Sequence, residues 1–217
     1  MADWTIVVAN KNYSSWSLRG WLALKQTGAA FEEIVIPLDE PTTREQILRH
    51  SPSGKLPLLK HGETVVWESL AIGEYLAEQF PQAGLWPQDA GARAYARSIS
   101  TEMATNFMAM RQNMPMNMRA SHAGKGMGAG VQDEVNRISA IWRHCRERFG
   151  KDGPFLFGAF SMADAMYAPV ASRFTTYHVK LDEVSEAYRQ AILAHPPYQE
   201  WFAAAKKEPW IIPKYEL

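Results

Sequence analysis

The feature that most constrains the fold is a change of hydrophobic pattern about one third of the way along the chain. Up to about residue 80, short apolar runs rich in β-branched residues alternate with segments of helical spacing. Beyond about residue 93, strand patterns almost vanish and helical spacing remains. The change predicts an α/β domain followed by an all-helical domain.

The first part has the pattern of a small mixed sheet with helices. Strands are predicted at 4–9, 31–38, 56–60 and 64–67, and helices at 16–25, about 42–50 and about 69–80. The initial strand–helix–strand order implies a parallel pair with a right-handed crossover. His61-Gly62 between the last two strands indicates a hairpin turn. The predicted order is therefore βαβαββα.

The second part is predicted to be all-α. Helical patterns cover about 93–119, 131–149, 162–178, 185–194 and 198–207. Pro81 ends the last helix of the first part, and the segment that follows has the composition of a linker. We therefore expect a first domain at 1–81, a linker at 82–92 and a second domain at 93–217.

Composition narrows the classes of partner. Lys plus Arg and Asp plus Glu both number 23, so we expect neither nucleic acid nor an anionic membrane as a partner. No run approaches the ~18 apolar residues of a membrane helix, and the N-terminus lacks the pattern of a signal peptide. Cys145 is the only cysteine, which fits a reducing compartment and a cytoplasmic location. Without Cys-x-x-Cys or His-Glu-x-x-His, no metal site is expected.

The segment from Asn12 to Arg19 carries the first candidate site. It joins the end of the first predicted strand to the first predicted helix, and ligands of open α/β sheets gather at such strand ends. A helix N-terminus offers free N–H groups and partial positive charge, and the hydroxyls of Ser14 and Ser15 add donors. These groups suit an anion. The alternative is that one of the two serines only caps the helix.

Two further segments carry groups that suit a peptide ligand. Leu56-Pro57 opens a predicted strand, and a cis bond there would turn the Leu56 backbone toward an extended ligand. Glu68 and Ser69 stand at a predicted helix start and suit the ammonium and carboxylate of an amino-acid head group. The alternatives are an ordinary edge-strand proline and a helix cap without a ligand.

The order of these segments resembles a known family. Ser-Ser-Trp-Ser-Leu-Arg, Gly-Lys-Leu-Pro and Glu-Ser-Leu-Ala-Ile-Gly-Glu-Tyr-Leu, over residues 14–76, resemble the N-terminal domain of cytosolic glutathione transferases. The opening is most similar to the bacterial-type, zeta-like serine enzymes. The stretch 158–164 resembles the family's N-capping box, a structural element. The resemblance implies a thioredoxin-like N-terminal domain followed by an all-helical glutathione-transferase C-terminal domain.

The resemblance also implies roles for the candidate residues. Ser14 would face the sulfur of bound glutathione, and Ser15 could share or take that role. The other implied glutathione contacts are Lys55 at the glycyl carboxylate, the Leu56 backbone, Pro57 as a cis proline, and Glu68 with Ser69 at the γ-glutamyl end. Glutathione would act as co-substrate, without a metal, and the hydroxyl and helix start would lower its thiol pKa.

The second substrate would lie against the helical domain. A methionine-rich stripe from Met103 to Met118 offers adaptable apolar surface. The residues of this stretch that we expect in the pocket are Phe107, Met108, Arg111 and Met114, and Trp16 is expected to join them from the first domain. The alternatives are that the stripe is core and that Arg111 and Arg173 are solvated rather than contacts of an anionic substrate.

Three functions remain in view from the resemblance. The first is a detoxifying transferase that joins glutathione to small, mostly apolar electrophiles, working as a homodimer. The second is a zeta-type cis–trans isomerase similar to maleylacetoacetate isomerase, against which Trp16 counts, because the zeta pattern has cysteine there. The third is a non-enzymatic binding protein with the same fold.

Overall fold

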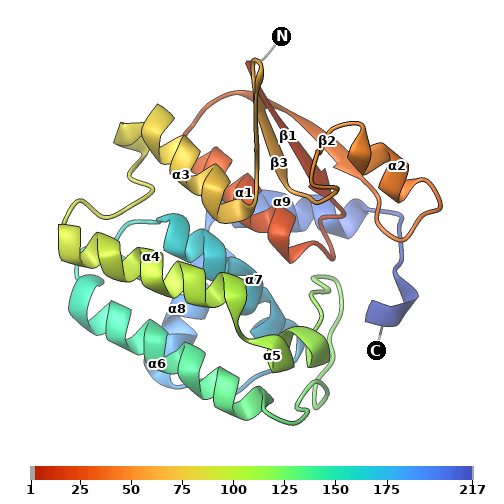
Figure 1. Ribbon diagram of the computed structural model, residues 1–217. Coiled ribbons are helices and arrows are strands. Elements are labelled where there is room, and N and C mark those ends of the chain that lie inside the picture. The colour runs from red at the N-terminus through yellow and green to blue at the C-terminus, as the bar shows by residue number, and fades with distance from the viewer. Residues whose placement is uncertain (1–2, 217) are drawn as a thin grey trace.

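A computed structural model describes residues 3–216 (Figure 1). The N-terminal domain contains β1 (Trp4–Ala9), α1 (Ser15–Gln26), β2 (Phe31–Ile36), α2 (Thr43–Leu48), β3 (Leu58–His61), β4 (Thr64–Trp67) and α3 (Ser69–Gln79). The sheet order is β2-β1-β3-β4, with β1 and β2 parallel and the other neighbours antiparallel. This confirms the predicted βαβαββα order and mixed sheet.

Alternation along β1 explains how the sheet is covered on both faces. Ile6 and Val8 belong to the main core, which includes residues of α1 and α3. Val7 points the other way and packs with Ile47 of α2 and Leu58 of β3. Because successive strand residues face opposite sides, one apolar strand is buried between two layers.

The C-terminal domain is helical, as predicted. It contains α4 (Ala90–Thr105), α5 (Met108–Asn113), α6 (Val131–Phe149), α7 (Met162–Thr176), α8 (Glu183–Ala194) and α9 (Pro196–Lys207), and short 3₁₀ turns lie at Pro81–Ala83 and Pro213–Tyr215. Helix α7 is central, and all but one of its residues are buried. Within residues 3–216, no helix is long and apolar enough to cross a membrane.

One predicted helix is wrong. The sequence predicts a single helix over about 93–119, but the structure ends α4 at Thr105 and starts the separate, short α5 at Met108. Phe107 lies between them in the left-handed region, with φ 64°. Arg111 then reaches back to the carbonyls of Met103 and Asn106 at the end of α4. This side chain supplies hydrogen bonds that the interrupted helix no longer makes.

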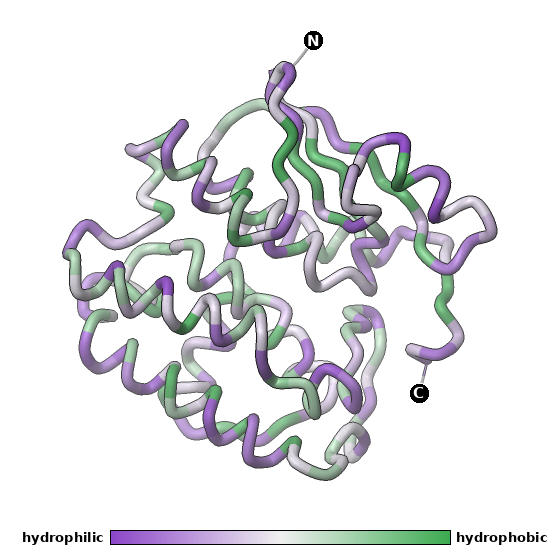
Figure 2. The backbone as a smooth tube through the Cα atoms, viewed as in Figure 1, coloured by the Kyte–Doolittle hydropathy of each residue, from purple (hydrophilic) through white to green (hydrophobic). Residues whose placement is uncertain are grey.

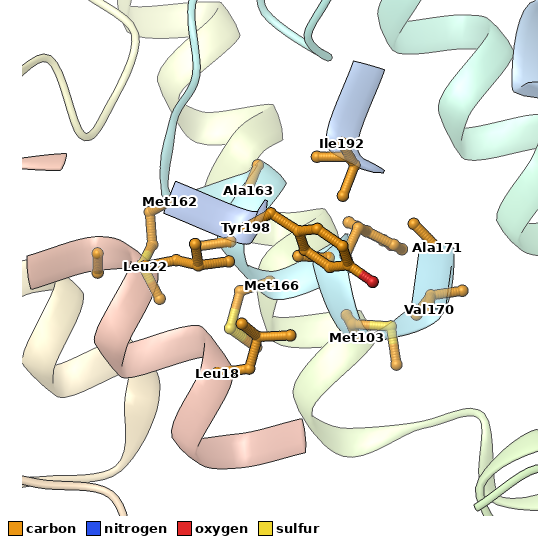
Figure 3. Packing of buried hydrophobic residues seen from close by; sticks show 14 of the residues in the cluster. Leu18, Leu22, Met103, Met162, Ala163, Met166, Val170, Ala171, Ile192 and Tyr198 are labelled. Atoms are coloured by element: carbon orange, nitrogen blue, oxygen red, sulfur yellow. The ribbon is translucent and has the colours of Figure 1, made fainter. Parts of the chain in front are cut away.

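The two domains share one core. Leu18 and Leu22 of α1 lie against Met162 and Met166 of α7 (Figure 3). Apolar segments gather between the layers, while polar segments mark the outer turns of the helices (Figure 2). Helix α1 therefore packs on the sheet and on the helical domain together, and its N-terminus stands where the domains meet (Figure 1).

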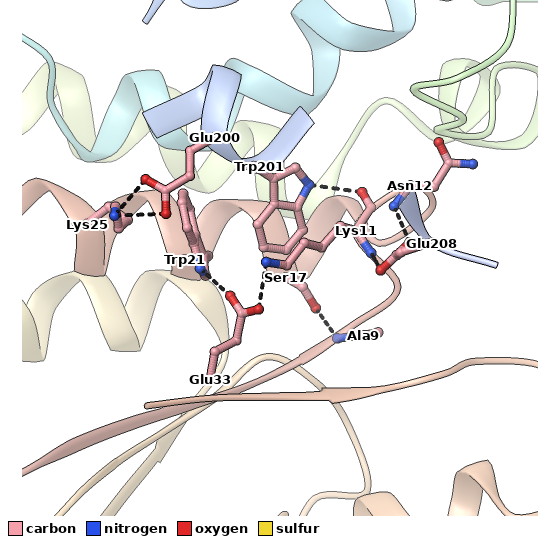
Figure 4. Close-up of polar contacts among 10 residues, drawn as sticks. All are labelled: Ala9, Lys11, Asn12, Ser17, Trp21, Lys25, Glu33, Glu200, Trp201 and Glu208. Carbon is pink, nitrogen blue, oxygen red and sulfur yellow. Dashed lines mark hydrogen bonds and ion pairs between the residues drawn. The ribbon is translucent and has the colours of Figure 1, made fainter. Parts of the chain in front are cut away.

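Helix α9 and the residue that follows it hold the loop after β1 in place (Figure 4). The Glu208 carboxylate accepts hydrogen bonds from the backbone N–H of Lys11, at 2.6 Å, and of Asn12, at 3.0 Å. The indole of Trp201 donates to the Lys11 carbonyl at 2.9 Å. Because this loop leads directly to Ser14, the C-terminal segment positions the first candidate site.

Candidate functional site

Two adjoining cavities border the N-terminus of α1. The first has a volume of about 360 Å³ and is lined by Ala9, Ser14, Trp16, Leu38, Ile47, Gly54, Lys55, Leu56, Pro57, Glu68 and Ser69. The second, of about 250 Å³, is lined by Tyr13, Ser14, Ser15, Trp16, Leu38, Arg111, Pro115, Met116, Arg173 and Tyr215. Ser14, Trp16 and Leu38 border both. The three sequence segments that predict a ligand site therefore converge on one cavity.

Ser14 is the N-cap of α1. Its hydroxyl accepts from the Ser17 backbone N–H at 3.3 Å and donates to the Ser17 hydroxyl at 2.8 Å. The Ser17 oxygen in turn accepts from the Ala9 N–H at 2.9 Å. A chain of hydrogen bonds therefore runs from the end of β1 to the Ser14 hydroxyl, which lies at the junction of the two cavities. Ser17 is an element of the site that the sequence analysis missed, although Ser14-x-x-Ser17 has the spacing of a helix cap.

Ser15 occupies a different place. It is the first residue of α1 and borders only the second cavity. The capping role that the sequence left open between the two serines belongs to Ser14.

The peptide bond between Leu56 and Pro57 is cis, as predicted, and both residues line the first cavity. The Pro57 ring packs directly on α1 at Gly20, where an added Cβ would stand 2.9 Å from the proline Cγ. Glycine at position 20 thus permits the close approach of helix and loop.

The start of α3 closes the far end of the first cavity. Glu68 has φ 67°, a conformation that non-glycine residues rarely adopt and that clusters at ligand sites. The Ser69 hydroxyl donates to the Trp16 carbonyl at 3.1 Å, which ties α3 to α1. At the rim, the Lys55 ammonium lies 3.9 Å from the Glu68 carboxylate, with both side chains mostly exposed. So loose a surface pair leaves both charges available to a ligand.

The second cavity differs from its expected wall. Trp16 and Arg111 line it, but Phe107, Met108 and Met114 do not. Phe107 and Met114 are buried in the core, and Met108 is 54% exposed. Of the methionine stripe, Met116 is the residue that lines this cavity, next to Pro115. Tyr13 and Tyr215 complete it, and the contribution of Tyr215 from the far C-terminus leaves no signal in the local sequence.

Two other kinds of candidate chemistry, a metal site and a reactive thiol, are not found among residues 3–216. Among residues 3–216, no three His, Cys, Asp or Glu side chains form a group that could hold a metal ion. Cys145 is fully buried on α6, and burial raises the pKa of its thiol to about 12. A thiol with that pKa stays protonated and unreactive near neutral pH.

Comparison with known proteins identifies the family. The model of the glutathione S-transferase N-terminal domain matches residues 13–79, and that of the C-terminal domain matches residues 128–204. The first match lies in the N-terminal domain and includes α1 with its N-cap Ser14, and the second lies in the helical domain. The chain belongs to the glutathione S-transferase family.

Individual relatives are distant. The chain is 24% identical to glutathione S-transferase L1 of Arabidopsis thaliana over 195 residues, 87% of this chain and 73% of that protein. It is 29% identical to a probable maleylacetoacetate isomerase of Caenorhabditis elegans over 138 residues, 63% of this chain and 64% of the relative. The structure of a glutathione transferase homolog from Burkholderia gl BGR1, with bound glutathione, has a TM-score of 0.73 at 21% identity and covers 94% of this chain and 99% of that one.

Proposed function

We propose that this protein is a glutathione S-transferase that binds glutathione in the first cavity and joins its thiolate to a small electrophile held in the second. One observation carries the proposal: the Ser14 hydroxyl, at the N-terminus of α1, borders both cavities. The thiolate of a peptide held in one cavity would attack a carbon held in the other next to this hydroxyl. Proximity of the two substrates then contributes directly to the rate.

Glutathione would lie along the first cavity with its γ-glutamyl end at α3. The Ser69 N–H suits its carboxylate, and the Ser69 hydroxyl can turn from the Trp16 carbonyl to the same group. Glu68 suits its ammonium group. The backbone of Leu56 would pair with the cysteinyl residue in the manner of an added strand. Lys55, at the rim, is suited to the glycyl carboxylate. These roles extend the glutathione-bound state of the Burkholderia homolog to this chain.

The proposed chemistry begins with ionisation of the thiol. Hydroxyl hydrogens rotate, so Ser14 can turn its proton from Ser17 to the sulfur while Ser17 donates to Ser14. The Ala9 N–H would then polarise a chain of two hydroxyls that ends on the thiolate. With a chlorinated nitroarene, the thiolate forms a carbon–sulfur bond, the carbon–chlorine bond breaks, and chloride leaves with the electron pair. The thiol proton passes to solvent.

A glutathione-dependent isomerase is the second candidate, and similarity to the probable maleylacetoacetate isomerase supports it. The same thiolate would add to a double bond and leave after rotation about that bond. Glutathione would then be regenerated rather than consumed.

We assign residues 1–81 to the glutathione domain, 82–92 to a linker whose last three residues already belong to α4, and 93–217 to the domain of the second substrate. The protein would act in detoxification in the cytoplasm, and it would do so as a homodimer.

The deciding measurement is turnover of 1-chloro-2,4-dinitrobenzene with and without glutathione, followed by mass spectrometry of the product. The proposal expects a saturable, glutathione-dependent rate and the loss of one glutathione per product. Binding to immobilised glutathione without turnover of any electrophile would leave the non-enzymatic alternative. No binding and no turnover would overturn both.

A further inference from the structure

Two arginines lie against Trp16 at the junction of the domains, and a third lines the same cavity. The guanidinium carbon of Arg19 lies 4.5 Å from the centroid of the Trp16 ring, and that of Arg111 lies 5.1 Å from it. Arg173 of α7 lines the second cavity together with Arg111. The three side chains come from α1, α5 and α7, so only the folded chain gathers them.

None of these guanidinium groups has a carboxylate partner among residues 3–216. Within residues 3–216, five other arginines make ion pairs, but Arg19, Arg111 and Arg173 make none. The nearest acid with an effect on Arg111 is Glu134, whose oxygens already accept from two backbone N–H groups of α5. The cluster therefore carries positive charge that the described chain does not neutralise.

Backbone contacts satisfy only part of the donors. Arg19 is fully buried and, among the described residues, bonds only to the Met166 carbonyl, at 2.9 Å, so that both of its terminal nitrogens lack a partner there. Arg173, 4% exposed, bonds to the carbonyls of Met114 and Pro169 through two of its nitrogens. Arg111 likewise uses two nitrogens on the carbonyls at the end of α4, which leaves Nη1 free of these contacts. Burying unpaired charge and unused donors is costly unless a ligand completes the arrangement.

The charges also act on one another. Burial and, to a smaller extent, the neighbouring charge of Arg111 together lower the pKa of Arg173 to about 9. Burial likewise lowers the pKa of Arg19, as do Arg111 and Arg173. Like charges held together at a cavity mark a place where an anion is stabilised.

We propose that the second substrate is a small, planar electrophile with a carboxylate, which Arg111 and Arg173 bind in the second cavity while Arg19 adds positive charge from behind Trp16. A planar guanidinium matches a carboxylate through paired hydrogen bonds. The aromatic walls formed by Tyr13, Trp16 and Tyr215 suit a flat unsaturated group. A cavity of about 250 Å³ limits the ligand to a compact molecule.

This inference rests on the proposed function and differs from the sequence expectation of mostly apolar electrophiles. A second use of the arginines, to hold a carboxylate of glutathione, would require glutathione to enter the second cavity. The first cavity has its own candidates for both carboxylates, Lys55 and the start of α3. The two uses make opposite predictions for the KM of glutathione.

The test compares 4-chloro-3-nitrobenzoate with 4-chloro-3-nitrobenzamide, each rate being divided by its uncatalysed rate with glutathione. These substrates share the reacting carbon and leaving group and differ in charge. We expect the wild-type protein to favour the acid, and Arg111→Gln to lower the acid-to-amide ratio of kcat/KM by about 10- to 100-fold. Arg173→Gln should act in the same direction. Thermal unfolding is checked for both variants, because Arg173 is buried and Arg111 bonds to the carbonyls at the end of α4. Arg137→Gln, which removes an exposed ion pair with Glu102, is the matched control and should keep the ratio.

Binding of the unreactive 3-nitrobenzoate, measured by calorimetry with and without glutathione, makes the test independent of turnover and of the folding of any variant. Binding of the acid to the wild-type protein, with 3-nitrobenzamide bound at least 10-fold more weakly, supports the inference. Equal binding or equal use of acid and amide overturns it, as does a raised glutathione KM in Arg111→Gln with an unchanged ratio. Turnover of the amide without any preference for the acid would defeat the inference and leave the proposed function standing. Selective acid binding without glutathione-dependent turnover would support a carboxylate site in the second cavity and defeat the proposed function.

Discussion

The Ser14 hydroxyl has two possible partners for its proton, the Ser17 oxygen that it contacts now and the sulfur that we propose it meets. We predict that Ser14→Ala raises the pKa of bound glutathione and lowers turnover. A hydrogen bond to a charged group contributes roughly 1.5–3 kcal/mol, so the loss should be about 10- to 100-fold near neutral pH. Because the thiol ionises unaided in alkali, the loss should shrink as pH rises. A pH–rate profile and ultraviolet titration of the thiolate measure both effects.

Ser15→Ala is the matched control for that experiment, since the two hydroxyls are adjacent but only Ser14 borders the first cavity. A profile shifted by Ser15→Ala and not by Ser14→Ala would transfer the role to Ser15. If neither variant shifts the profile, backbone donors at the helix start carry the stabilisation.

Ser69 acts at the opposite end of the proposed glutathione site. We predict that Ser69→Ala raises the KM of glutathione about 10-fold and changes kcat little, because this contact is equally strong in the ground and transition states. Steady-state kinetics with glutathione as the varied substrate test this. Ser98→Ala, at an exposed position of α4 that lines neither cavity, serves as the control. An unchanged KM would remove Ser69 from the glutathione contacts.

At the scale of the element, α7 depends on its first turn. Asp164 reaches back to the Ser161 N–H at 2.8 Å, which forms the predicted capping box. Its buried carboxylate also accepts from the Leu156 N–H and the Tyr188 hydroxyl, at 3.0 and 3.1 Å. The same residue thus fastens the preceding loop and α8 to the central helix.

We therefore predict that Asp164→Ala lowers the free energy of unfolding by about 3 kcal/mol, because it strands several buried donors at once. Denaturant titration followed by circular dichroism measures the change. Ser161→Ala removes a hydroxyl but keeps the carboxylate, and should cost about 1 kcal/mol. Equal losses in the two variants would show that the cap alone, and not the wider set of contacts, is responsible.

At the scale of the whole molecule, one edge of the sheet is open. Strand β4 ends the sheet, and Val65 and Trp67 on its outer face are 37% and 41% exposed. Exposed apolar residues on an edge strand favour association. We predict a homodimer with a mass twice 24.5 kDa by light scattering at micromolar concentration, and a shift toward monomer in Val65→Glu. A monomeric wild-type protein would contradict the prediction; a Val65→Glu variant that remains dimeric would move the interface elsewhere.

The sequence by itself determined the order of elements, because apolar spacing encodes local conformation and each strand or helix must bury its own face. The strands at Trp4–Ala9 and Thr64–Trp67 and the helix at Val131–Phe149 match their predictions residue for residue. The cap at Asp164 is equally local, which explains why its spacing was informative. The first cavity was also within reach, because its three segments carry motifs that resemble a known family.

Only the tertiary structure decided what the second cavity is made of. The left-handed Phe107 between α4 and α5 is invisible to helical periodicity, and of the methionine stripe Met103, Met110 and Met114 are buried in the core. Arg19, Arg111, Arg173 and Tyr215 lie far apart in sequence and meet only when α1, α5, α7 and the C-terminal segment pack together. Local patterns report which face of an element is apolar. They do not report which charges long-range packing will leave side by side without a partner, and here those charges determine the proposed substrate.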